Sequence, residues 1–117
     1  MVNTGLKRLW NALHYSLAGF AAACKNEAAF RQELLLALVL IPAAMFLPVS
    51  ATGKTLMIAS VLLVLVVELL NSAIEAVVDR ISLENHELAK RAKDIGSAAV
   101  MLSLVNLTVV WLLIIFF

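Results

Sequence analysis

Residues 55–80 of this chain read TLMIASVLLVLVVELLNSAIEAVVDR. Apolar residues dominate a length that meets the roughly 20 residues an α-helix needs to cross a bilayer. The charged residues that interrupt the stretch before Asp79 are Glu68 and Glu75. We therefore predict a transmembrane helix over residues 54–79, and the two glutamates become the first candidates for a functional role.

Glu68 falls deep in this predicted helix. At about 1.5 Å of rise per residue, it lies roughly 21 Å along the helix from Lys54. The hydrocarbon layer is about 30 Å thick, so Glu68 is inside it or at its inner edge. A carboxylate there costs on the order of 2.5–3.5 kcal/mol on insertion scales. Glu75 returns to nearly the same helix face, about 10 Å nearer the cytoplasm.

Further polar residues share this face of the helix. The set consists of Glu68, Asn71, Ser72, Glu75 and Asp79. Ionisable side chains inside a membrane segment indicate a functional site. The alternative is that these groups hold helices together through buried hydrogen bonds. Uncharged side chains would do that at lower cost, so the glutamates favour a function, whereas Asn71 and Ser72 alone fit either interpretation.

The composition indicates an integral membrane protein. Of the 117 residues, 63 % are hydrophobic and 15 % are charged, and the mean hydropathy is +1.00. An average soluble domain is about half apolar and a quarter charged. A net charge of +1 gives no reason to expect a nucleic-acid partner. One cysteine and two histidines do not suffice for a Cys/His metal cluster, and the length predicts a single domain over residues 1–117.

Two further transmembrane helices are predicted, over residues 28–48 and 96–117. Pro42 lies inside the first of them, where spanning helices tolerate proline. Residues 48–53 have the composition of a turn between two helices, and residues 80–94 form a charged cytoplasmic segment. The predicted fold class is therefore an all-α membrane protein with three transmembrane helices.

The distribution of basic residues predicts the orientation through the positive-inside rule. One side of the membrane would carry Lys54 alone. The other side would carry the remaining eight basic residues, which are Lys7, Arg8, Lys25, Arg31, Arg80, Lys90, Arg91 and Lys93. We therefore expect the N-terminus in the cytoplasm and the C-terminus outside, which agrees with an odd number of spans.

Residues 5–25 carry apolar side chains at helical spacing, with polar side chains between them. This pattern predicts an amphipathic helix that lies in the membrane interface, with Trp10 at the depth of the lipid headgroups. The alternative is a secretory signal peptide with its cleavage site at residues 22–24. Asn11 and His14 interrupt the apolar core that such a peptide requires, so we favour the interfacial helix.

More acids and bases lie at the predicted cytoplasmic ends of the helices. Glu27 and Glu33 flank the start of the first span, and residues 84–87 and 90–94 add charged and amide groups. Two carboxylates from different helices near a basic cluster can hold Mg²⁺ that bridges phosphate oxygens. A deeper, desolvated carboxylate at Glu68 suits a general base. Phosphate chemistry at the inner membrane surface is thus one interpretation, and a merely solvated charged face is the other.

Three stretches resemble the family of bacterial integral-membrane diacylglycerol kinases. They read NEAAFRQE at residues 26–33, ELLNSAIEAVVDR at 68–80 and RAKDIGSAA at 91–99. The resemblance covers nearly the whole chain and implies a homotrimer in the bacterial inner membrane, with active sites at the subunit boundaries near the cytoplasmic face. It also implies transfer of the γ-phosphate of MgATP to the primary hydroxyl of diacylglycerol, which gives phosphatidic acid and serves phospholipid recycling.

The resemblance further implies roles for individual residues. Glu68 corresponds to the catalytic base, Glu27 and Glu75 to the carboxylates that bind Mg²⁺, and Asn71 to a supporting residue. The implied ATP contacts are Tyr15, Glu27, Glu75, Glu84, Asn85, His86, Lys93 and Asp94. The implied contacts with the lipid substrate are Arg8, Arg31, Gln32, Glu33, Phe46, Lys54, Glu68, Ser97 and Trp111.

Two other functions stay open at this point. A sister group of the same family performs the same chemistry on undecaprenol, although residues 26–33 are closer to the diacylglycerol group. A small proton-coupled exporter would also bury a glutamate in a short chain. Exporters of that type have four transmembrane helices and a single carboxylate in the membrane, however, whereas this chain has three predicted spans. A kinase consumes ATP in detergent micelles, whereas an exporter needs a sealed vesicle and a gradient.

Overall fold

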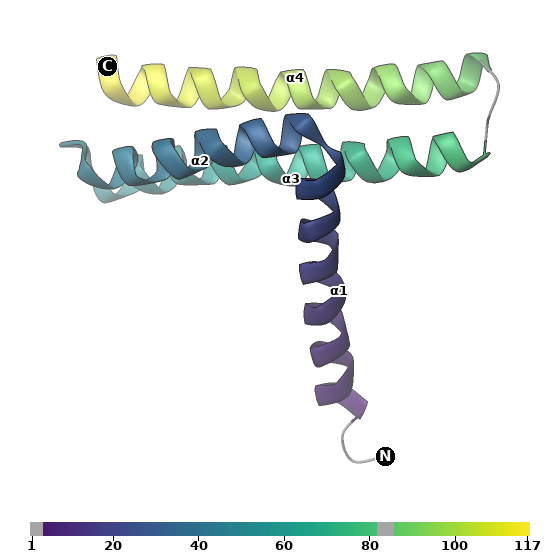
Figure 1. Ribbon diagram of the computed structural model, residues 1–117. Coiled ribbons are helices and arrows are strands. Elements are labelled where there is room, and N and C mark those ends of the chain that lie inside the picture. Colours follow the sequence, from purple (N-terminus) through teal and green to yellow (C-terminus); the bar gives the residue numbers. More distant parts are fainter. Residues whose placement is uncertain (1–3, 82–85) are drawn as a thin grey trace.

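The computed structural model describes residues 4–81 and 86–117, and these residues fold entirely into α-helices and short connections. The helices are α1 (Thr4–Asn26), α2 (Ala28–Phe46), α3 (Ala51–Ile81) and α4 (Glu87–Phe116). Figure 1 shows that α2, α3 and α4 run alongside one another, while α1 leaves this bundle and runs across it. The predicted all-α fold is confirmed.

Three of the helices, α2, α3 and α4, are long and apolar enough to cross a membrane. They overlap the predicted spans with different ends. The helix α2 ends at Phe46, two residues before the predicted end, whereas α3 continues to Ile81 and α4 begins already at Glu87. Most large apolar side chains on these helices are exposed, including Leu35, Leu38, Met101 and Leu102. A soluble protein rarely exposes so much contiguous apolar surface, whereas lipid tails solvate it at no cost. The chain is therefore a membrane protein.

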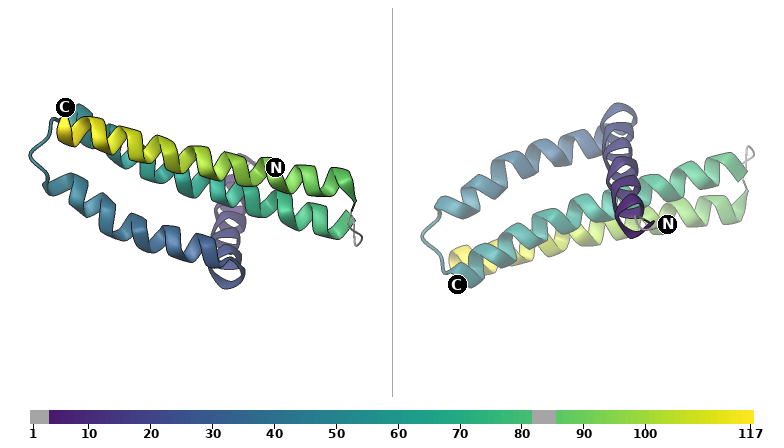
Figure 2. Two further views of the ribbon diagram at one scale, coloured as in Figure 1. Left: turned by 90° about the horizontal axis from the view of Figure 1, so that it is seen from above. Right: turned by 90° about the horizontal axis from the view of Figure 1, so that it is seen from below.

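The closest pairing in the bundle is between α3 and α4, which lie side by side in both views of Figure 2. Near the C-terminus of α4, the Trp111 indole Nε1 donates hydrogen bonds to the Met57 carbonyl and to Ser60 Oγ, both at 3.2 Å. Gly53 lets the two helices approach here, since a Cβ at that position would lie 3.2 Å from Ile114 Cγ2. These contacts fix α4 against α3 at the end of the bundle away from the acidic residues.

The connection between α2 and α3 is tied down by side chains. Lys54 Nζ donates a hydrogen bond of 2.8 Å to the Met45 carbonyl, in the last turn of α2. Ser50 Oγ accepts from the Gly53 backbone N–H at 3.0 Å in the first turn of α3. Both bonds satisfy backbone groups that helix ends otherwise leave without partners. The predicted turn over residues 48–53 thus begins two residues after the end of α2 at Phe46 and includes the first three residues of α3.

The core between α2 and α3 is small. Its buried apolar side chains are Phe30, Ala37 and Ala44 from α2 and Met57, Val61 and Val64 from α3. Phe30 and Met57 are the largest fully buried side chains. Because Phe30 lies near the start of α2, its burial anchors the end of α2 that adjoins α1 and the acidic residues.

Candidate active site

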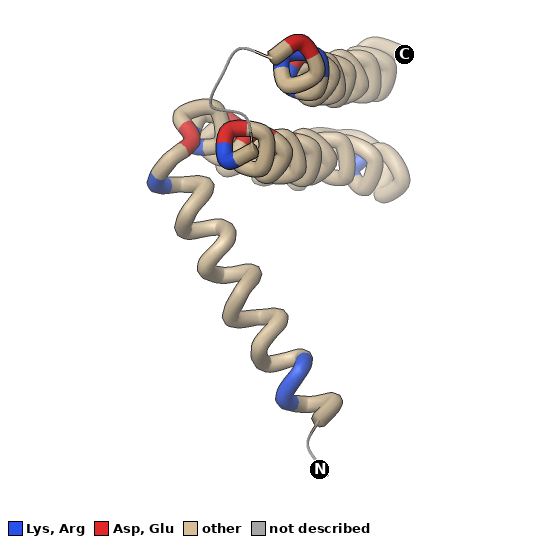
Figure 3. Tube along the Cα trace, turned by 90° about the vertical axis from the view of Figure 1, so that its right-hand side faces the viewer, with Lys and Arg blue, Asp and Glu red and all other residues tan. Residues whose placement is uncertain are grey.

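Charged residues gather at one end of the bundle, where α1 joins α2 (Figure 3). Glu27 occupies the break between these helices, with an extended backbone at φ −116° and ψ 106°. It is the N-cap residue of α2, but its carboxylate does not accept a capping hydrogen bond from that helix. The Glu27 carboxylate is therefore free for a ligand.

Arg31 holds the corner at Glu27 in place. Its guanidinium Nη1 donates to the carbonyls of Cys24 at 2.7 Å and Lys25 at 3.2 Å, in the last turn of α1. These carbonyls are among the groups that a helix C-terminus leaves without partners, and a cation is favoured there. One side chain of α2 therefore closes α1 and sets where the chain turns at Glu27.

The polar face of α3 points into the bundle. Glu68 and Asn71 are buried, with 4 % and 7 % of their surfaces exposed. The Asn71 Nδ2 donates a hydrogen bond of 3.1 Å to Glu75 Oε1, one turn further along the helix. This bond holds the Glu75 carboxylate beside Asn71, as expected for two residues one turn apart on the predicted polar face.

Acids from three parts of the fold meet around Glu68. The charges of Glu75 and Glu27 act on Glu68, and Glu68 in turn acts on Glu33 of α2. A cation bound among carboxylates offsets their mutual repulsion. The arrangement thus offers a buried carboxylate oxygen at Glu68 and more accessible carboxylates at Glu27 and Glu75.

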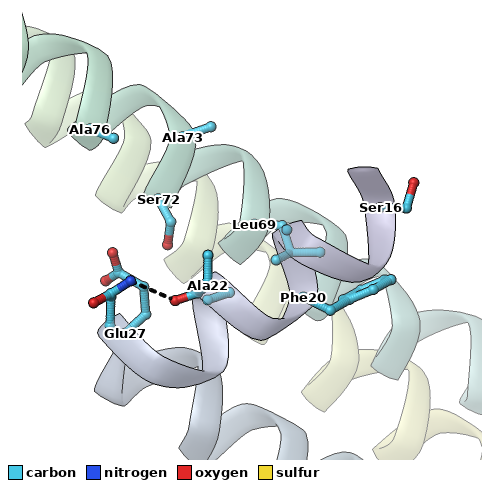
Figure 4. Close-up of a pocket in the computed structure, with 11 residues that line it drawn as sticks. Ser16, Phe20, Ala22, Glu27, Leu69, Ser72, Ala73 and Ala76 are labelled. Atoms are coloured by element: carbon cyan, nitrogen blue, oxygen red, sulfur yellow. Dashed lines mark hydrogen bonds between the residues drawn. The ribbon is translucent and has the colours of Figure 1, made fainter. Parts of the chain in front are cut away.

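A pocket of about 460 Å³ lies between α1 and α3, and Glu27 is the one of these acids that lines it. Its lining residues are Ser16, Gly19, Phe20, Ala22, Ala23, Asn26 and Glu27 together with Leu69, Ser72, Ala73 and Ala76. In Figure 4 the Ser72 hydroxyl and the Glu27 side chain lie at one end of the pocket and Phe20 toward the other. Within the described part of the chain, the buried Ser72 Oγ has no hydrogen-bond partner. The pocket therefore combines an apolar wall with polar groups that a ligand can engage.

The carboxylates of this site can bind Mg²⁺ only when a substrate supplies further ligands. Among residues 4–81 and 86–117, no three His, Cys, Asp or Glu side chains are arranged to hold a metal ion by themselves. Mg²⁺ usually takes one or two protein carboxylates and completes its octahedron with water and substrate phosphates. Glu27 and Glu75 supply hard oxygen donors of this kind, so the residues fit a metal that arrives with a nucleotide.

The residues that the resemblance assigns to ATP lie on several elements. Lys93 forms an ion pair with Asp79 at 2.5 Å, which joins α4 to α3, and Lys90 pairs with Asp94 at 2.9 Å within α4. His86 begins α4, and its Nδ1 accepts a hydrogen bond of 3.1 Å from the Leu88 N–H. Tyr15 lies on α1 with 75 % of its surface exposed. Two further positions, Glu84 and Asn85, lie outside the described residues.

The residues assigned to the lipid substrate divide into three groups. Arg31, Gln32, Glu33, Glu68 and Ser97 lie on the parts of α2, α3 and α4 near the acids. Phe46, Lys54 and Trp111 lie at the other end of the bundle, and Arg8 lies near the N-terminus of α1. From Arg31 to Phe46, α2 rises about 22 Å. A lipid headgroup at the acids therefore cannot also contact Phe46, whereas acyl chains can run along α2 toward it.

The sequence pattern did not single out two features of this site. Phe20 and Gly19 line the pocket, whereas the sequence predicted residues 5–25 only as an amphipathic helix. Gly96 of α4 faces Asn71 so closely that a Cβ would lie 3.2 Å from Asn71 Cγ. An isolated glycine inside a helical pattern is the signal that could have pointed to such a close contact.

Comparison with known proteins gives one family. The family model described as prokaryotic diacylglycerol kinase matches residues 14–115. A protein of Pseudomonas aeruginosa named diacylglycerol kinase is 63 % identical over 108 residues, which cover 92 % of this chain and 88 % of that protein. Relatives of the same name from Haemophilus influenzae and Escherichia coli are 54 % identical over 114 residues and 52 % over 108 residues. These matches cover 97 % and 92 % of this chain, and 97 % and 88 % of the relatives.

Proposed function

Because this chain belongs to the prokaryotic diacylglycerol kinase family and is a kinase of diacylglycerol, we propose that the acids at the junction of α1, α2 and α3 carry out the transfer. In this proposal the γ-phosphate of ATP passes to the primary hydroxyl of diacylglycerol, and the products are phosphatidic acid and ADP. The observation that carries the proposal is the buried Glu68 among other carboxylates, beside a pocket that opens between α1 and α3.

Glu68 is the general base in this proposal. The hydroxyl oxygen of diacylglycerol forms a bond to the γ-phosphorus while the bond from that phosphorus to the bridging oxygen of ADP breaks. The hydroxyl proton moves to a Glu68 carboxylate oxygen. Phosphoryl transfer asks mainly for positioning and charge neutralisation, so a few carboxylates on rigid helices can support it without a soluble kinase fold.

Glu27 and Glu75 would hold Mg²⁺ together with the nucleotide phosphates. The chemistry that Mg²⁺ would supply there is neutralisation of the charge that develops on the phosphate oxygens. Asn71 supports this arrangement by its hydrogen bond to Glu75. Lys93 and Asp94 at the start of α4, together with Tyr15, Glu84, Asn85 and His86, contribute the remaining ATP contacts.

The lipid approaches from the bilayer side. Gln32 and Glu33 of α2 and Ser97 of α4 contact the glycerol end near Glu68, assisted by Arg8 and Arg31. The acyl chains extend along the bundle toward Phe46, Lys54 and Trp111. The two substrates thus meet from opposite phases, ATP from water and diacylglycerol from lipid.

The wider setting follows from the same proposal. The protein is a homotrimer in the bacterial inner membrane, with the N-terminus in the cytoplasm and the C-terminus outside. Residues 5–25 lie in the membrane interface, residues 28–48, 54–79 and 96–117 span the bilayer, and residues 80–94 lie on the cytoplasmic side. The active sites lie at subunit boundaries, where a neighbouring subunit covers the flank of α3.

The test is transfer of labelled phosphate from MgATP in mixed micelles, with diacylglycerol and undecaprenol offered in parallel. We expect labelled phosphatidic acid as the dominant product. If undecaprenol is the preferred substrate, the proposed active site stands and the assignment of the lipid substrate is wrong. If neither lipid is labelled by folded protein with Mg²⁺ present, the proposal is wrong and proton-coupled transport becomes the next assay.

A further inference from the structure

Among the glycines, Gly96 of α4 makes the closest approach to a neighbouring helix, at Asn71 of α3. A Cβ built on Gly96 would lie 3.2 Å from Asn71 Cγ and would overlap Asn71 Oδ1. At Gly5 and Gly19, in contrast, a Cβ would meet open space. The backbone of α4 therefore lies so close to Asn71 that any residue larger than glycine at position 96 would clash with the Asn71 side chain.

This contact holds the Asn71 amide from two sides. Nδ2 donates to Glu75 Oε1 at 3.1 Å, and Oδ1 is buried and accepts no conventional hydrogen bond from the described residues. The direction that a Cβ would take at Gly96 is occupied by a Cα hydrogen, which therefore points at Oδ1. Weak Cα–H···O contacts of this kind recur where helices pack closely.

The two contacts select one orientation of the amide. If the Asn71 amide were reversed, its oxygen would face a carboxylate oxygen of Glu75, and the two acceptors would repel each other. With the observed orientation, the only donor group of the side chain is directed at Glu75. The close packing of Gly96 also limits how far the Asn71 side chain can swing away from Glu75.

We propose that Gly96 is a positioning residue for the kinase reaction, because its missing side chain lets Asn71 stand between α3 and α4 and hold the Glu75 carboxylate. The inference rests on the proposed role of Glu75 as a ligand of Mg²⁺. Gly96 acts through Asn71.

The direct test is Gly96→Ala, assayed at increasing Mg²⁺ concentration. The overlapping atom, Oδ1, is the end of a side chain that can rotate, so we expect the protein to fold and the Asn71 amide to move. Loss of a hydrogen bond to a charged group corresponds to roughly a tenfold effect. We therefore expect the Mg²⁺ concentration for half-maximal velocity to rise roughly tenfold.

A double-mutant cycle separates this mechanism from general damage. In Asn71→Ala, the atom that stays near a Cβ at position 96 is the Cβ of residue 71, at an ordinary distance of 3.9 Å. Gly96→Ala should then have no further effect in the Asn71→Ala background. Equal effects of Gly96→Ala in both backgrounds would mean that the two residues act independently, and would overturn the proposal.

The double-mutant cycle can be measured by ligand binding even in variants with little turnover. The shift in thermal unfolding produced by Mg²⁺ with a non-hydrolysable ATP analogue reports ligand binding without catalysis. We expect this shift to shrink in Gly96→Ala and in Asn71→Ala, and to shrink no further in the double variant. A full shift in Gly96→Ala would contradict the proposal.

Gly53→Ala is the matched control, because it adds a methyl group to the same pair of helices at the opposite end. Its Cβ would lie 3.2 Å from Ile114 Cγ2, so we expect altered stability with unchanged Mg²⁺ dependence. The proposal is wrong if Gly53→Ala changes the Mg²⁺ dependence as much as Gly96→Ala. Unchanged Mg²⁺ dependence in Glu75→Gln would instead overturn the metal role in the proposed function, which keeps the two failures distinct.

Discussion

At the scale of single residues, the acids at the α1–α2–α3 junction differ in how accessible they are. Glu68 is buried, whereas Glu27 lies in the break between two helices and faces the pocket. In the proposed function the buried carboxylate accepts a proton and the more accessible carboxylates bind a cation. Glu68 and Glu75 lie on α3, whereas Glu27 lies at the start of α2. Substitution of Glu68 should therefore lower turnover, whereas substitution of Glu27 or Glu75 should weaken metal binding.

Glu27→Gln and Glu75→Gln should each weaken the binding of MgATP. A carboxamide keeps the size of the side chain but removes the charge that attracts the metal. We expect the Mg²⁺ concentration for half-maximal velocity to rise roughly tenfold in each variant, with partial rescue by Mn²⁺. Titration of velocity against each metal checks this, and unaltered apparent metal affinity in both variants would count against the metal site.

At the scale of elements, two side chains fix how the helices meet. Arg31 of α2 closes the last turn of α1, and Trp111 of α4 is bonded to the backbone of α3 at Met57. The first contact lies beside the acids and the second at the far end of the bundle. Substitutions at Arg31 and Trp111 can therefore distinguish the effect on activity of the α1–α2 junction from the effect of helix packing in general.

Arg31→Ala should destabilise the corner between α1 and α2. The guanidinium donates to two helix-terminal carbonyls, and loss of a charged donor costs roughly 1.5–3 kcal/mol. We expect a lower unfolding temperature together with a raised Mg²⁺ requirement, because Glu27 is no longer held in place. Arg31→Lys should restore the unfolding temperature and the Mg²⁺ requirement only in part, since an ammonium group cannot donate two parallel hydrogen bonds as the planar guanidinium does. A variant with wild-type unfolding and wild-type Mg²⁺ requirement would refute this role.

Trp111→Phe should lower stability and leave turnover at saturating lipid nearly unchanged, because the aromatic ring that faces the acyl chains in the proposed function is kept. The substitution keeps an aromatic ring but removes the Nε1 donor, at a cost of roughly 0.5–1.5 kcal/mol. Thermal unfolding in detergent and specific activity at saturating substrates check the two parts. A large loss of turnover with unchanged stability would show instead that the indole N–H serves the reaction and not the packing of α4 on α3.

At the scale of the whole molecule, one chain leaves its site open. Phe20 and other apolar side chains of α1 are exposed, and the pocket lies on the flank between α1 and α3. Three spans form too small a bundle to shield the acids from lipid on every side. A second copy of the chain covering that flank would complete the wall of the pocket.

Assembly can be tested directly by mass. We expect native mass spectrometry from detergent to give a complex of three 12.7 kDa chains, and activity to fall when dilution into excess detergent separates them. A fully active monomer would contradict the assignment of the sites to subunit boundaries.

The sequence predicts the helices well and their contacts poorly, for a physical reason. Hydropathy and length follow from each segment alone, so residues 54–79 were recognisable as a span within α3. The shared face of Glu68 and Glu75 follows from helix periodicity. The contact of Gly96 with Asn71 and the bond from Trp111 to Met57 depend on how two helices cross, which no local pattern encodes.

The central claim is that Glu68 is the base that activates the lipid hydroxyl, and Glu68→Gln tests it most directly. The measurement pairs transfer of labelled phosphate to diacylglycerol with binding of a non-hydrolysable MgATP analogue. We predict that nucleotide binding stays within a few fold of the wild-type value while turnover falls at least a hundredfold, in line with the contribution of a general base. A Glu68→Gln protein that transfers phosphate at the wild-type rate would contradict the account.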